Sequence, residues 1–469
     1  MASPPPTPSR LAPAQSSEWR FCPITAPTEW VEDYRPGKFH PVHLGDQLKD
    51  GRYEILRKLG YGAYSTVWLA RDEQYDFAFI ADPDSSPTPC YRRLIKCYVA
   101  VKILTAQSTA SETESSILKT IAQSTLPHQG KEHIISLKDY FKHKGPNGEH
   151  GCLVFEPMGP STATMVERLP KPLLSKTGRS ERYPIWMARS ILRQALLGID
   201  FLHRIGIAHG DLQPGNLLFL ARDLTSVGEI RLSQKVIEPT SLEPVKRQDG
   251  KVDLWAPKYL AVNQPLTEFV ELDHNFVIKI SDMGGAFFID NPPKKLVTPV
   301  GLRSPETILG EVPTSSQDIW SFGCLVFEFV TGRPLFVVDD TGDEDETNDD
   351  HFLQLSSTIG PIPRDVLSKW ARSDVYFSPN GENIKSYIGE LPEGFDPSDL
   401  EHQPPLEELF DQERPAEISN EDSKQIMHIL RWILQYDATK RPSASDLLND
   451  PWFSGPSATN SQARPNVKP

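Results

Sequence analysis

The chain has 469 residues, which is enough to bury a large core in two or three domains. Its formal net charge of −14 disfavours nucleic acid as a direct partner and suits basic substrates. The five cysteines form no Cys-x-x-Cys pair and are odd in number, so neither a zinc site nor a disulfide framework is indicated. They fit the thiols of a reducing compartment.

Segments that would target a membrane are not apparent in the sequence. No apolar run approaches the roughly 18 residues of a membrane span. The N-terminal residues 1–8 lack the basic segment followed by an apolar one that is typical of a signal peptide. We therefore expect a soluble, intracellular protein, in the cytoplasm and/or the nucleus, that does not associate with membranes.

The two ends of the chain are rich in polar residues and proline. Residues 1–28 are rich in Pro, Ser and Ala and predict a disordered tail, as do residues 454–469. Residues 29–51 carry aromatic side chains among prolines. This mixture predicts a strap that lies on the surface of a domain.

The first regular pattern surrounds two glycines. Alternating residues 52–59 and the β-rich run 66–70 flank a turn that contains Gly60 and Gly62, which predicts a β-hairpin. Glycine lets the backbone approach a ligand closely, and the amides of such a turn can contact phosphate oxygens. Taken alone, the stretch is better explained as a plain turn.

A lysine stands within the next apolar strand. After an irregular insertion at residues 73–96, the run 97–104 predicts a strand that contains Lys102. Such a lysine either reaches out from a sheet edge or is held in a cleft by an anion. The run 110–121 predicts a helix that contains Glu114. Glu114 is either the ion-pair partner of Lys102 or one more solvated acid.

A change of period marks the middle of the chain. Strand signals at 133–140 and 151–156 end at residues 157–159, which predict a hinge. From Trp186 onward the period is helical, with apolar residues at positions 192, 195, 196, 199 and 202.

A polar loop at residues 209–219 follows this helix. It places Asp211 and Asn216 five positions apart. One loop with this spacing can present a carboxylate to a substrate hydroxyl and a carbonyl oxygen to a metal ion. An ordinary turn remains an alternative for this stretch, because Asp, Pro, Gly and Asn all favour turns.

The C-terminal half carries further landmarks. A long polar stretch at 221–275 precedes a strand that runs into Asp282-Met283-Gly284. The block 319–330 is apolar on nearly every face and predicts a buried helix. Asp318, just before it, can cap that helix or brace the polar loop. The acidic run 339–350 predicts a solvated loop, and residues 423–434 predict the last helix.

These motifs occur in the order that eukaryotic protein kinases share. A glycine-containing hairpin is followed by Ala-Val-Lys, a helix with Glu, a hinge, His-x-Asp-x-x-x-x-Asn, Asp-x-Gly, and Pro-Glu before a buried helix. The resemblance covers residues 52–453. It implies an α+β, bilobal protein kinase fold, with a β-rich N-lobe at 52–156 and a mainly helical C-lobe at 157–453 that contains the insert 221–275.

Within the kinases, the chain resembles the SR-protein kinase family, as a divergent, fungal-like member. That family phosphorylates serines in Arg/Ser-rich segments of splicing factors. Residues 58–70 look like its glycine-rich loop, with Ser65 where most kinases have a third glycine, and residues 34–42 resemble its N-terminal strap. The long separation between Asn216 and Asp282 matches the location of the family's spacer. Asp343-Glu344-Asp345 and the following residues look like its acidic loop and helix.

The resemblance implies ATP and Mg²⁺ as cofactors and assigns roles to matching residues. Asp211 orients the attacking hydroxyl and accepts its proton, and Asn216 and Asp282 hold Mg²⁺. Lys102 neutralises the α/β-phosphates and is held by Glu114. The residues implied to contact the nucleotide, besides Lys102, are Leu59, Gly60, Gly62, Ser65, Val67, Ala100, Phe155, Glu156 and Met158.

The resemblance also implies a structural ion pair and a set of partners. Glu306 is expected to pair with Arg441 within the large lobe. Basic Arg/Ser-rich proteins are the expected substrates, with a role in regulating mRNA splicing. We expect no direct binding to nucleic acid and a monomeric protein.

Two positions in the loop depart from the general kinase pattern. Gly210 replaces the Arg that normally meets a phosphorylated activation loop, and residues 283–304 contain hydroxyls only at Thr298 and Ser304. The SR-protein kinases also lack that Arg, so we expect no activation by loop phosphorylation. Gln213 replaces a Lys that stabilises the transferring phosphoryl group. Loss of that positioned charge could cost on the order of 2–4 kcal/mol of barrier.

Gln213 leaves two main hypotheses open. The first is an active serine/threonine kinase that acts on Arg-rich substrates. The second is a pseudokinase or scaffold that binds nucleotide with little turnover. The retention of Lys102, Glu114, Asp211 and Asn216, together with Asp282, favours the enzyme. A small-molecule kinase on a related fold is disfavoured by the Pro-Glu motif and Arg441.

Overall fold

The computed structural model divides into two compact units. Unit 1 comprises Met1–Gln123, Ile135–Pro160 and Phe219–Phe276, and unit 2 comprises Ser124–Ile134, Ser161–Leu218 and Val277–Pro469. No helix in the described part of the chain has the length and apolar character needed to cross a membrane. The structure describes residues 7–13, 15–78, 93–169, 175–177, 180–235, 242–339, 341–391, 395–396 and 403–454.

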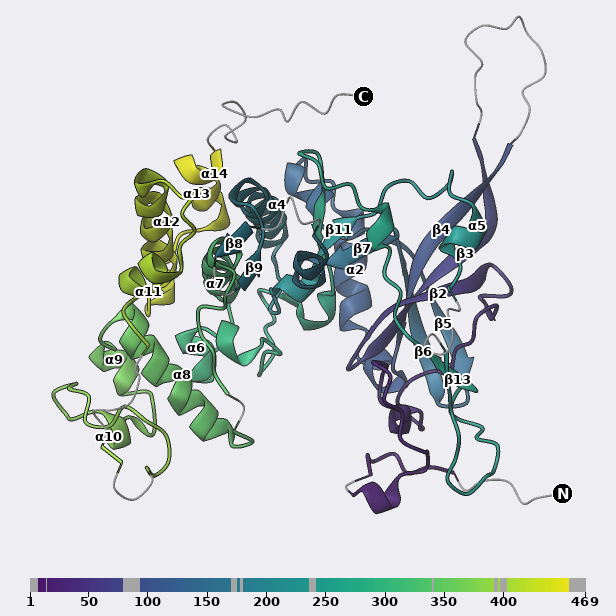
Figure 1. Cartoon of the computed structure of the whole chain (residues 1–469), viewed down its shortest axis with the longest axis horizontal. Coiled ribbons are helices and arrows are strands. Elements are labelled where there is room, and N and C mark those ends of the chain that lie inside the picture. Colours follow the sequence, from purple (N-terminus) through teal and green to yellow (C-terminus); the bar gives the residue numbers. More distant parts are fainter. Residues whose placement is uncertain are drawn as a thin grey trace, which may run out of the picture. The chain divides into compact units, whose positions relative to one another are not determined.

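Unit 1 is built on a six-stranded antiparallel sheet with the order β1-β2-β3-β4-β6-β5 (Figure 1). The predicted hairpin is present as β2 and β3, and the predicted helix with Glu114 is α2 (Thr113–Gln123). The sheet strands are β1 (Gln47–Leu48), β2 (Tyr53–Gly62), β3 (Ser65–Ala78), β4 (Arg93–Leu104), β5 (Leu137–Gly145) and β6 (Gly148–Phe155).

Alternation of side chains along these strands buries one face of the sheet. Tyr53, Trp68, Val101 and Val154 come from four strands and pack in one core cluster. The irregular insertion expected at 73–96 is shorter than predicted, because β3 continues to Ala78 and β4 begins at Arg93. The rest of that expected insertion lies outside the described residues.

The N-terminal segment is ordered earlier than its composition suggests. A disordered tail was expected up to residue 28, yet Phe21 is buried in a cluster with Tyr34 and Leu260. This apolar packing offsets the cost of ordering the chain. The segment also contains the short helices η1 (Ser16–Glu18) and η2 (Val31–Asp33). The expected tail after residue 454 lies outside the described residues.

The insert 221–275 differs from its expected assignment, because it clusters with unit 1 rather than with the helical part of the chain. Leu232 and Phe269 of the insert are buried against Leu56 and Leu69 of the sheet, which explains the difference. The elements of the insert are α5 (Glu229–Leu232), β12 (Leu242–Pro244), β13 (Tyr259–Ala261) and η6 (Thr267–Phe269). Unit 1 also contains α1 (Ala106–Thr109).

Unit 2 is mainly helical and is centred on two buried helices. The predicted helical period appears as α4 (Ile185–Arg204), and the apolar block forms α7 (Ser316–Thr331). These two helices pack together, and α12 packs on α7. Other helices are α3 (Thr162–Met165), α6 (Pro305–Ile308), α8 (Glu344–Ile359), α9 (Arg364–Leu367), α10 (Ser373–Tyr376), α11 (Leu406–Glu413), α12 (Asn420–Ile433), α13 (Ala444–Leu448) and α14 (Pro451–Ser454).

Short strands and 3₁₀ turns connect the helices of unit 2. The strands are β8 (Ser175–Thr177), β9 (Ser180–Arg182), β10 (Ile207–Ala208), β14 (Ile278–Ile280) and β15 (Phe287–Phe288). The turns are η3 (Gln129–His133), η4 (Val166–Arg168), η5 (Pro214–Asn216), η7 (Met283–Gly285), η8 (Val300–Leu302) and η10 (Ala438–Lys440). Strands β7 (Met158–Ser161) and β11 (Leu217–Leu220) each include a boundary between the units.

The acidic run is not the solvated loop that was expected. Its second half begins α8, because the Asp343 carboxylate caps that helix by accepting from the amides of Asp345 and Glu346. Asp349 is buried and accepts from the indole of Trp370 at 2.8 Å and the phenol of Tyr376 at 2.9 Å. Hydrogen bonds of this kind satisfy a carboxylate that burial would otherwise penalise.

The contact between α7 and α12 gives a test of the packing. A Cβ atom on Gly323 would lie 2.4 Å from Cγ2 of Ile433. We therefore expect Gly323→Ala to lower the free energy of unfolding by roughly 1–3 kcal/mol, as overpacked cores do. Urea unfolding followed by tryptophan fluorescence measures the change.

A matched control is Gly228→Ala, where a Cβ atom meets no atom within 4 Å and φ is −63°. We expect this variant to change the free energy of unfolding by less than about 0.5 kcal/mol. If the two variants unfold at the same urea concentration, α12 accommodates the added methyl group at position 323 without loss of stability.

Candidate active site

The glycine-rich hairpin and the strand with Lys102 lie in one row of the unit 1 sheet. Gly60 pairs with Val67, and Val67 in turn pairs with Lys102 on β4. Gly62 pairs with Ser65 at the tip of the hairpin. This register places the backbone of Gly60 in line with Lys102 across the sheet.

Lys102 forms an ion pair within unit 1. Its Nζ lies 2.6 Å from Oε1 of Glu114, in the first turn of α2. Both side chains are largely buried, with exposed fractions of 12% and 11%. Of the two interpretations of each residue, the structure therefore supports a paired lysine and a paired glutamate.

The other predicted nucleotide contacts lie on neighbouring strands of unit 1. Ala100 on β4 pairs with Phe155 at the end of β6, and Leu59 belongs to β2. Met158 begins β7. The Glu156 carboxylate accepts from the amide of Ser136 at 3.2 Å, so its side chain has a structural partner.

In unit 2, the predicted catalytic loop follows β10 and contains η5. Asn216 donates from Nδ2 to the Asp211 carboxylate at 3.0 Å, and Gln213 donates from Nε2 to the other carboxylate oxygen at 2.9 Å. Asn216 also donates to the backbone oxygen of Asp211 at 2.8 Å. Burial raises the pKa of Asp211 above its ordinary value, and the nearby Asp282 acts in the same direction.

Asp318 braces this loop from α7. Its carboxylate accepts from the backbone amides of His209 and Gly210, each at 2.8 Å. The ring of His203 contacts the same carboxylate at 2.8 Å. Although burial acts to raise the pKa of Asp318, its hydrogen bond with His203 and its contacts with His209 hold the pKa below the ordinary value. Of the two predicted roles, bracing is confirmed; the cap position of α7 is Ser315.

The two predicted metal ligands are brought together at the end of the loop. Ser281 donates from its amide to the backbone oxygen of Asn216 at 2.8 Å, which places Asp282 beside the loop. Asp282 has a left-handed backbone, with φ of 60°, and accepts from the amide of Gly284 at 3.1 Å. Asn216 and Asp282 offer an amide oxygen and a carboxylate, which are the hard oxygen ligands that Mg²⁺ prefers.

Within the described residues, no cluster of three or more His, Cys, Asp and Glu side chains could hold a metal ion by itself. Mg²⁺ commonly takes one or two protein carboxylates and completes its shell with waters and substrate phosphates. The donors at Asn216 and Asp282 therefore fit Mg²⁺ that arrives with a nucleotide.

Gly210 is required by the shape of the loop. It has φ of +70°, and a Cβ atom there would lie 2.6 Å from the backbone oxygen of Gly285. The backbone oxygen of Gly210 accepts from the hydroxyl of Thr298 at 2.6 Å. The absence of the usual Arg thus coincides with a backbone that has no room for any side chain.

The two hydroxyls of residues 283–304 are both buried and hydrogen-bonded. Thr298 has an exposed fraction of 1% and Ser304 of 0%. The Ser304 hydroxyl donates to Oε1 of Gln317 at 2.7 Å. Neither hydroxyl is accessible to another kinase in this structure, in line with the expectation that the loop needs no phosphorylation.

The predicted ion pair of unit 2 is present. Arg441 contacts both carboxylate oxygens of Glu306, at 2.6 and 2.7 Å. The guanidinium also lies over the ring of Trp320, 4.9 Å from its centroid. Bidentate geometry of this kind is the strongest form of an arginine–carboxylate contact.

Sequence reasoning missed one acid beside the predicted catalytic loop. Glu328 on α7 lines a hollow of about 150 Å³ together with Thr162, Tyr183, Pro214 and Arg182, whose guanidinium pairs with Glu417 at 3.1 Å. Burial raises the pKa of Glu328 to about 7. Among the described residues no cation forms an ion pair with it. The available signal was that Glu328 is the lone charged residue within an otherwise apolar block.

Comparisons with known proteins agree with this geometry. The protein kinase domain model matches residues 85–453. A solved crystal structure of a kinase domain superposes with a TM-score of 0.54 at 22% identity, covering 88% of this chain and 98% of that chain. At this identity the structural likeness supports the kinase fold and nothing finer.

Curated relatives are similar over most of the chain. A serine/threonine-protein kinase SRPK of Physarum polycephalum is 30% identical, covering 91% of each chain. The protein kinase dsk1 of Schizosaccharomyces pombe is 28% identical, covering 91% of this chain and 85% of its own. The serine/threonine-protein kinase SKY1 of Saccharomyces cerevisiae is 22% identical, covering 91% of this chain and 77% of its own.

The raised pKa of Glu328 predicts a pH-dependent stability. Folded Glu328 keeps its proton up to about pH 7, whereas the unfolded side chain loses it near the ordinary glutamate pKa of 4.5. Between these values the folded state binds more protons, so stability falls as pH rises. At pH 8 we expect the free energy of unfolding of Glu328→Gln to exceed that of the wild type by roughly 1–3 kcal/mol. At pH 4 we expect the free energy of unfolding of the variant to be no higher than that of the wild type.

Urea unfolding of both proteins at the two pH values measures this difference. Glu421→Gln, at the exposed start of α12, makes the same chemical change on the surface and serves as the control. If both variants raise the free energy of unfolding equally at pH 8, the gain in the Glu328 variant does not come from the burial of Glu328.

Proposed function

Because this chain belongs to the protein kinase family and, within it, to the SRPK-type serine/threonine kinases, we propose that it transfers the γ-phosphate of ATP to serine in Arg-rich, RS-type protein segments. The proposal concerns the substrate, since serine/threonine kinase activity belongs to the family itself. A pseudokinase reading has no support in these relatives, which are named as kinases.

The roles proposed for the site residues follow from their chemistry. Asp211 accepts a hydrogen bond from the substrate hydroxyl and takes its proton as the oxygen attacks. Lys102, held by Glu114, carries the positive charge for the nucleotide phosphates. Asn216 and Asp282 would hold Mg²⁺, which neutralises charge on the phosphates when it is bound. The amides at Gly60 and Gly62 would cover those phosphates, and the backbone at residues 156–158 would bind the adenine.

The observation that best supports an arginine-rich substrate is the hollow at Glu328. Its carboxylate is largely buried, has no described cation partner, and lies beside Pro214 of the catalytic loop. A guanidinium that enters the hollow would pair with this carboxylate and release the cost of its burial. An arginine near the target serine would therefore bind better than an uncharged residue.

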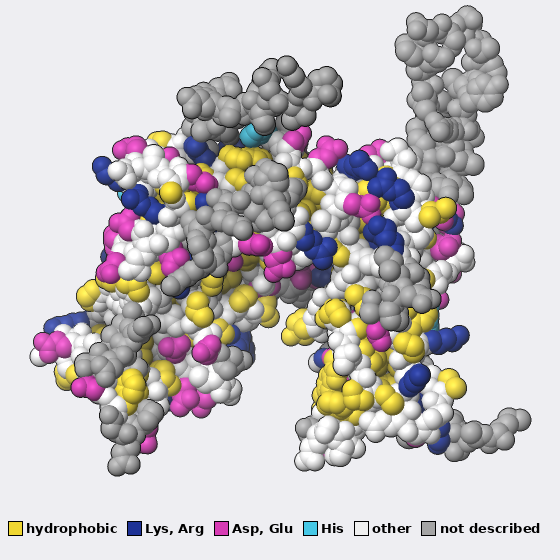
Figure 2. Space-filling model, viewed as in Figure 1, with side chains coloured by type: hydrophobic (Ala, Val, Ile, Leu, Met, Phe, Trp, Pro, Cys, Tyr) yellow, Lys and Arg dark blue, Asp and Glu magenta, His cyan; other side chains and the backbone are white. Residues whose placement is uncertain are grey.

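The charge of the rest of the protein agrees with a basic substrate. The net charge is −14, and the exposed residues Asp343, Glu344 and Asp345 stand at the start of α8. Acidic side chains are visible over the part of unit 2 that contains α8 (Figure 2). A surface of this sign raises the association rate of basic chains.

Further parts of the proposal concern regulation and location. With Thr298 and Ser304 buried and Gly210 in place of an arginine, the kinase would be active without loop phosphorylation. RS-type substrates imply an effect on mRNA splicing, and hence work in the cytoplasm and/or the nucleus. The proposed form is a monomer that binds its protein substrate directly and does not bind nucleic acid.

Radiolabelled phosphate transfer to an Arg-Ser repeat peptide tests the proposal. We expect transfer that Asp211→Ala abolishes and that a Lys-Ser repeat peptide supports less well, because lysine lacks the planar fork of arginine. We expect Glu328→Gln to raise the KM for the Arg-Ser peptide about tenfold, about 1.4 kcal/mol of binding, with the KM for ATP unchanged. Wild-type transfer no greater than that of Asp211→Ala would contradict the proposal.

The position of Gln213 gives a separate prediction. Its amide donates to Asp211 but brings no charge to the transferring phosphoryl group. We expect Gln213→Lys to raise kcat by about one to three orders of magnitude, corresponding to 2–4 kcal/mol of electrostatic stabilisation. Gln213→Met, which has neither charge nor donor, is the control and should lower kcat. An unchanged kcat in the lysine variant would mean that another cation already serves this position.

A further inference from the structure

We propose that the N-terminal segment (residues 18–42) and the described part of the insert (residues 221–235 and 242–275) form a brace that fixes the base of the glycine-rich loop, and that Glu29 and Gln234 are positioning residues for nucleotide binding. The inference rests on the proposed function in one respect, namely that this loop covers the nucleotide phosphates. All the contacts that carry it lie within unit 1.

The first observation is that β2 has an open edge which the insert covers. β3 pairs with one side of β2, whereas β1 covers only Tyr53 and Glu54 on the other side. The backbone of Ile55 pairs with Gly45 and Asp46, and beyond Ile55 the insert supplies the missing partners. The amide of Gln234 donates to the backbone oxygen of Leu56, and the amide of Gln264 donates to that of Lys58, both at 2.8 Å. The insert thus acts as a substitute for an edge strand.

The side chain of Gln234 adds further hydrogen bonds, one to β2 and one within the insert. Its Oε1 accepts from the amide of Lys58 at 3.0 Å, and its Nε2 donates to the backbone oxygen of Val262 at 2.9 Å. Arg57 adds a third contact, because its guanidinium donates to the backbone oxygens of Arg231 and Ser233 at 2.6 and 3.1 Å. The insert therefore holds β2 directly before Gly60.

The second observation is a buried charge at the same place. Lys58 has an exposed fraction of 0%, and its ammonium pairs with Glu29, whose exposed fraction is 3%. The hydroxyl of Tyr34 donates to the other oxygen of Glu29 at 2.5 Å. Burial lowers the pKa of Lys58, and Glu29 opposes that shift. Since Lys58 lies two residues before Gly60, this pair fixes the strand from which the loop begins.

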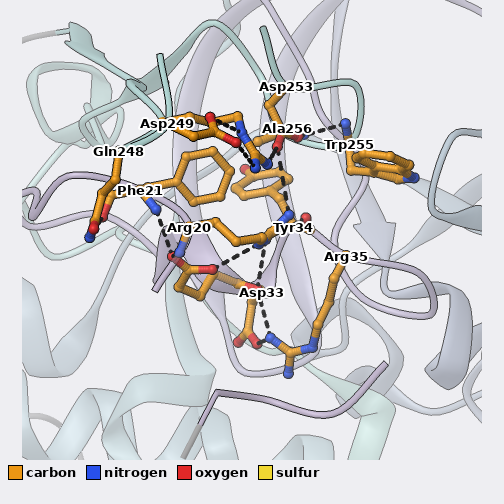
Figure 3. A network of polar contacts seen from close by, with 12 residues as sticks. Arg20, Phe21, Asp33, Tyr34, Arg35, Gln248, Asp249, Asp253, Trp255 and Ala256 are labelled. Atoms are coloured by element: carbon orange, nitrogen blue, oxygen red, sulfur yellow. Dashed lines mark hydrogen bonds and ion pairs between the residues drawn. The ribbon is translucent and has the colours of Figure 1, made fainter. Parts of the chain in front are cut away.

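The third observation is that the two halves of the brace are fastened to one another. Figure 3 shows Arg20 and Phe21 of the N-terminal segment beside Gln248 and Asp253 of the insert. The amide of Gln248 donates to the backbone oxygen of Arg20 at 2.9 Å, and its side chain donates to that of Phe21 at 3.1 Å. The guanidinium of Arg20 lies 3.7 Å from Asp253.

Within the N-terminal segment, Glu32 accepts from Arg20 at 2.9 Å and from the amide of Phe21 at 2.9 Å. Glu32 is as buried as Glu29 but makes none of the described contacts to β2. Because Glu32 holds Arg20, which contacts the insert, Glu32→Gln disturbs the junction between the two halves but leaves Lys58 paired with Glu29. The two variants therefore separate the effect of the counter-charge at the base of the loop from the effect of that junction.

The test compares Glu29→Gln with Glu32→Gln in the full chain. The first change leaves the buried ammonium of Lys58 without its counter-charge, which destabilises the base of the loop. We expect the dissociation constant for Mg·ATP, measured by calorimetry, to rise about tenfold in Glu29→Gln and less than twofold in Glu32→Gln. The kcat and the KM for the Arg-Ser peptide should change less than twofold in both.

Two further variants guard against a simple loss of folding. Glu29→Gln/Lys58→Met removes the uncompensated charge and should restore most of the affinity for Mg·ATP. Gln234→Ala leaves the ion pair intact but removes the acceptor for the amide of Lys58, and should weaken Mg·ATP binding in the same way. Equal effects of the Glu29 and Glu32 variants, or no rescue by the double variant, would overturn the proposal.

Hydrogen exchange without nucleotide tests the brace independently of kinase activity. We expect the amides of residues 58–65 to exchange faster in Glu29→Gln and Gln234→Ala than in the wild type or Glu32→Gln. Unchanged exchange there would overturn the brace even if ATP binding changed. Faster exchange in a protein that binds no Mg·ATP would leave the brace standing but would contradict its role in nucleotide binding, and the proposed function with it.

Discussion

The hydrogen bonds of the buried Asp318 carboxylate hold the loop at residues 209–219 against the helical core of unit 2. The carboxylate accepts from two consecutive backbone amides, at His209 and Gly210, and so sets the path of the chain into Asp211. The acid stands in the first turn of α7, the helix that is buried on nearly all sides. Because a core helix cannot shift without disturbing its neighbours, the proposed catalytic loop takes its position from the hydrophobic core itself.

The features that sequence reasoning predicted share one property, which is a strong local pattern or an ordered motif. In β2, β3, α4 and α7 the spacing of apolar residues within one short segment was enough to predict the element. The pairs Lys102–Glu114 and Glu306–Arg441 followed from the order of kinase motifs, and both are present. The bracing role of Asp318 was one of two that its position allowed.

The features that were missed depend on contacts between distant segments or on single polar residues. No period in residues 221–275 indicates that Gln234 and Gln264 complete the edge of β2, because backbone hydrogen bonds leave no compositional signal. The acidic run gave the pattern of a loop, yet Asp343 acts as a helix cap. Glu328 stands within an apolar block of the sequence, and the hollow that it lines is formed by residues far away in the chain.

The open edge of β2 has a consequence for the order in which the protein is made. The strand emerges from the ribosome early, whereas Gln264 follows roughly 200 residues later, which at about 5–20 residues per second takes on the order of 10–40 s. During this interval the nascent chain exposes unpaired backbone groups next to apolar side chains, a combination that invites pairing with other chains. The edge of β2 beyond Ile55 therefore lacks its native partners until the insert has been translated.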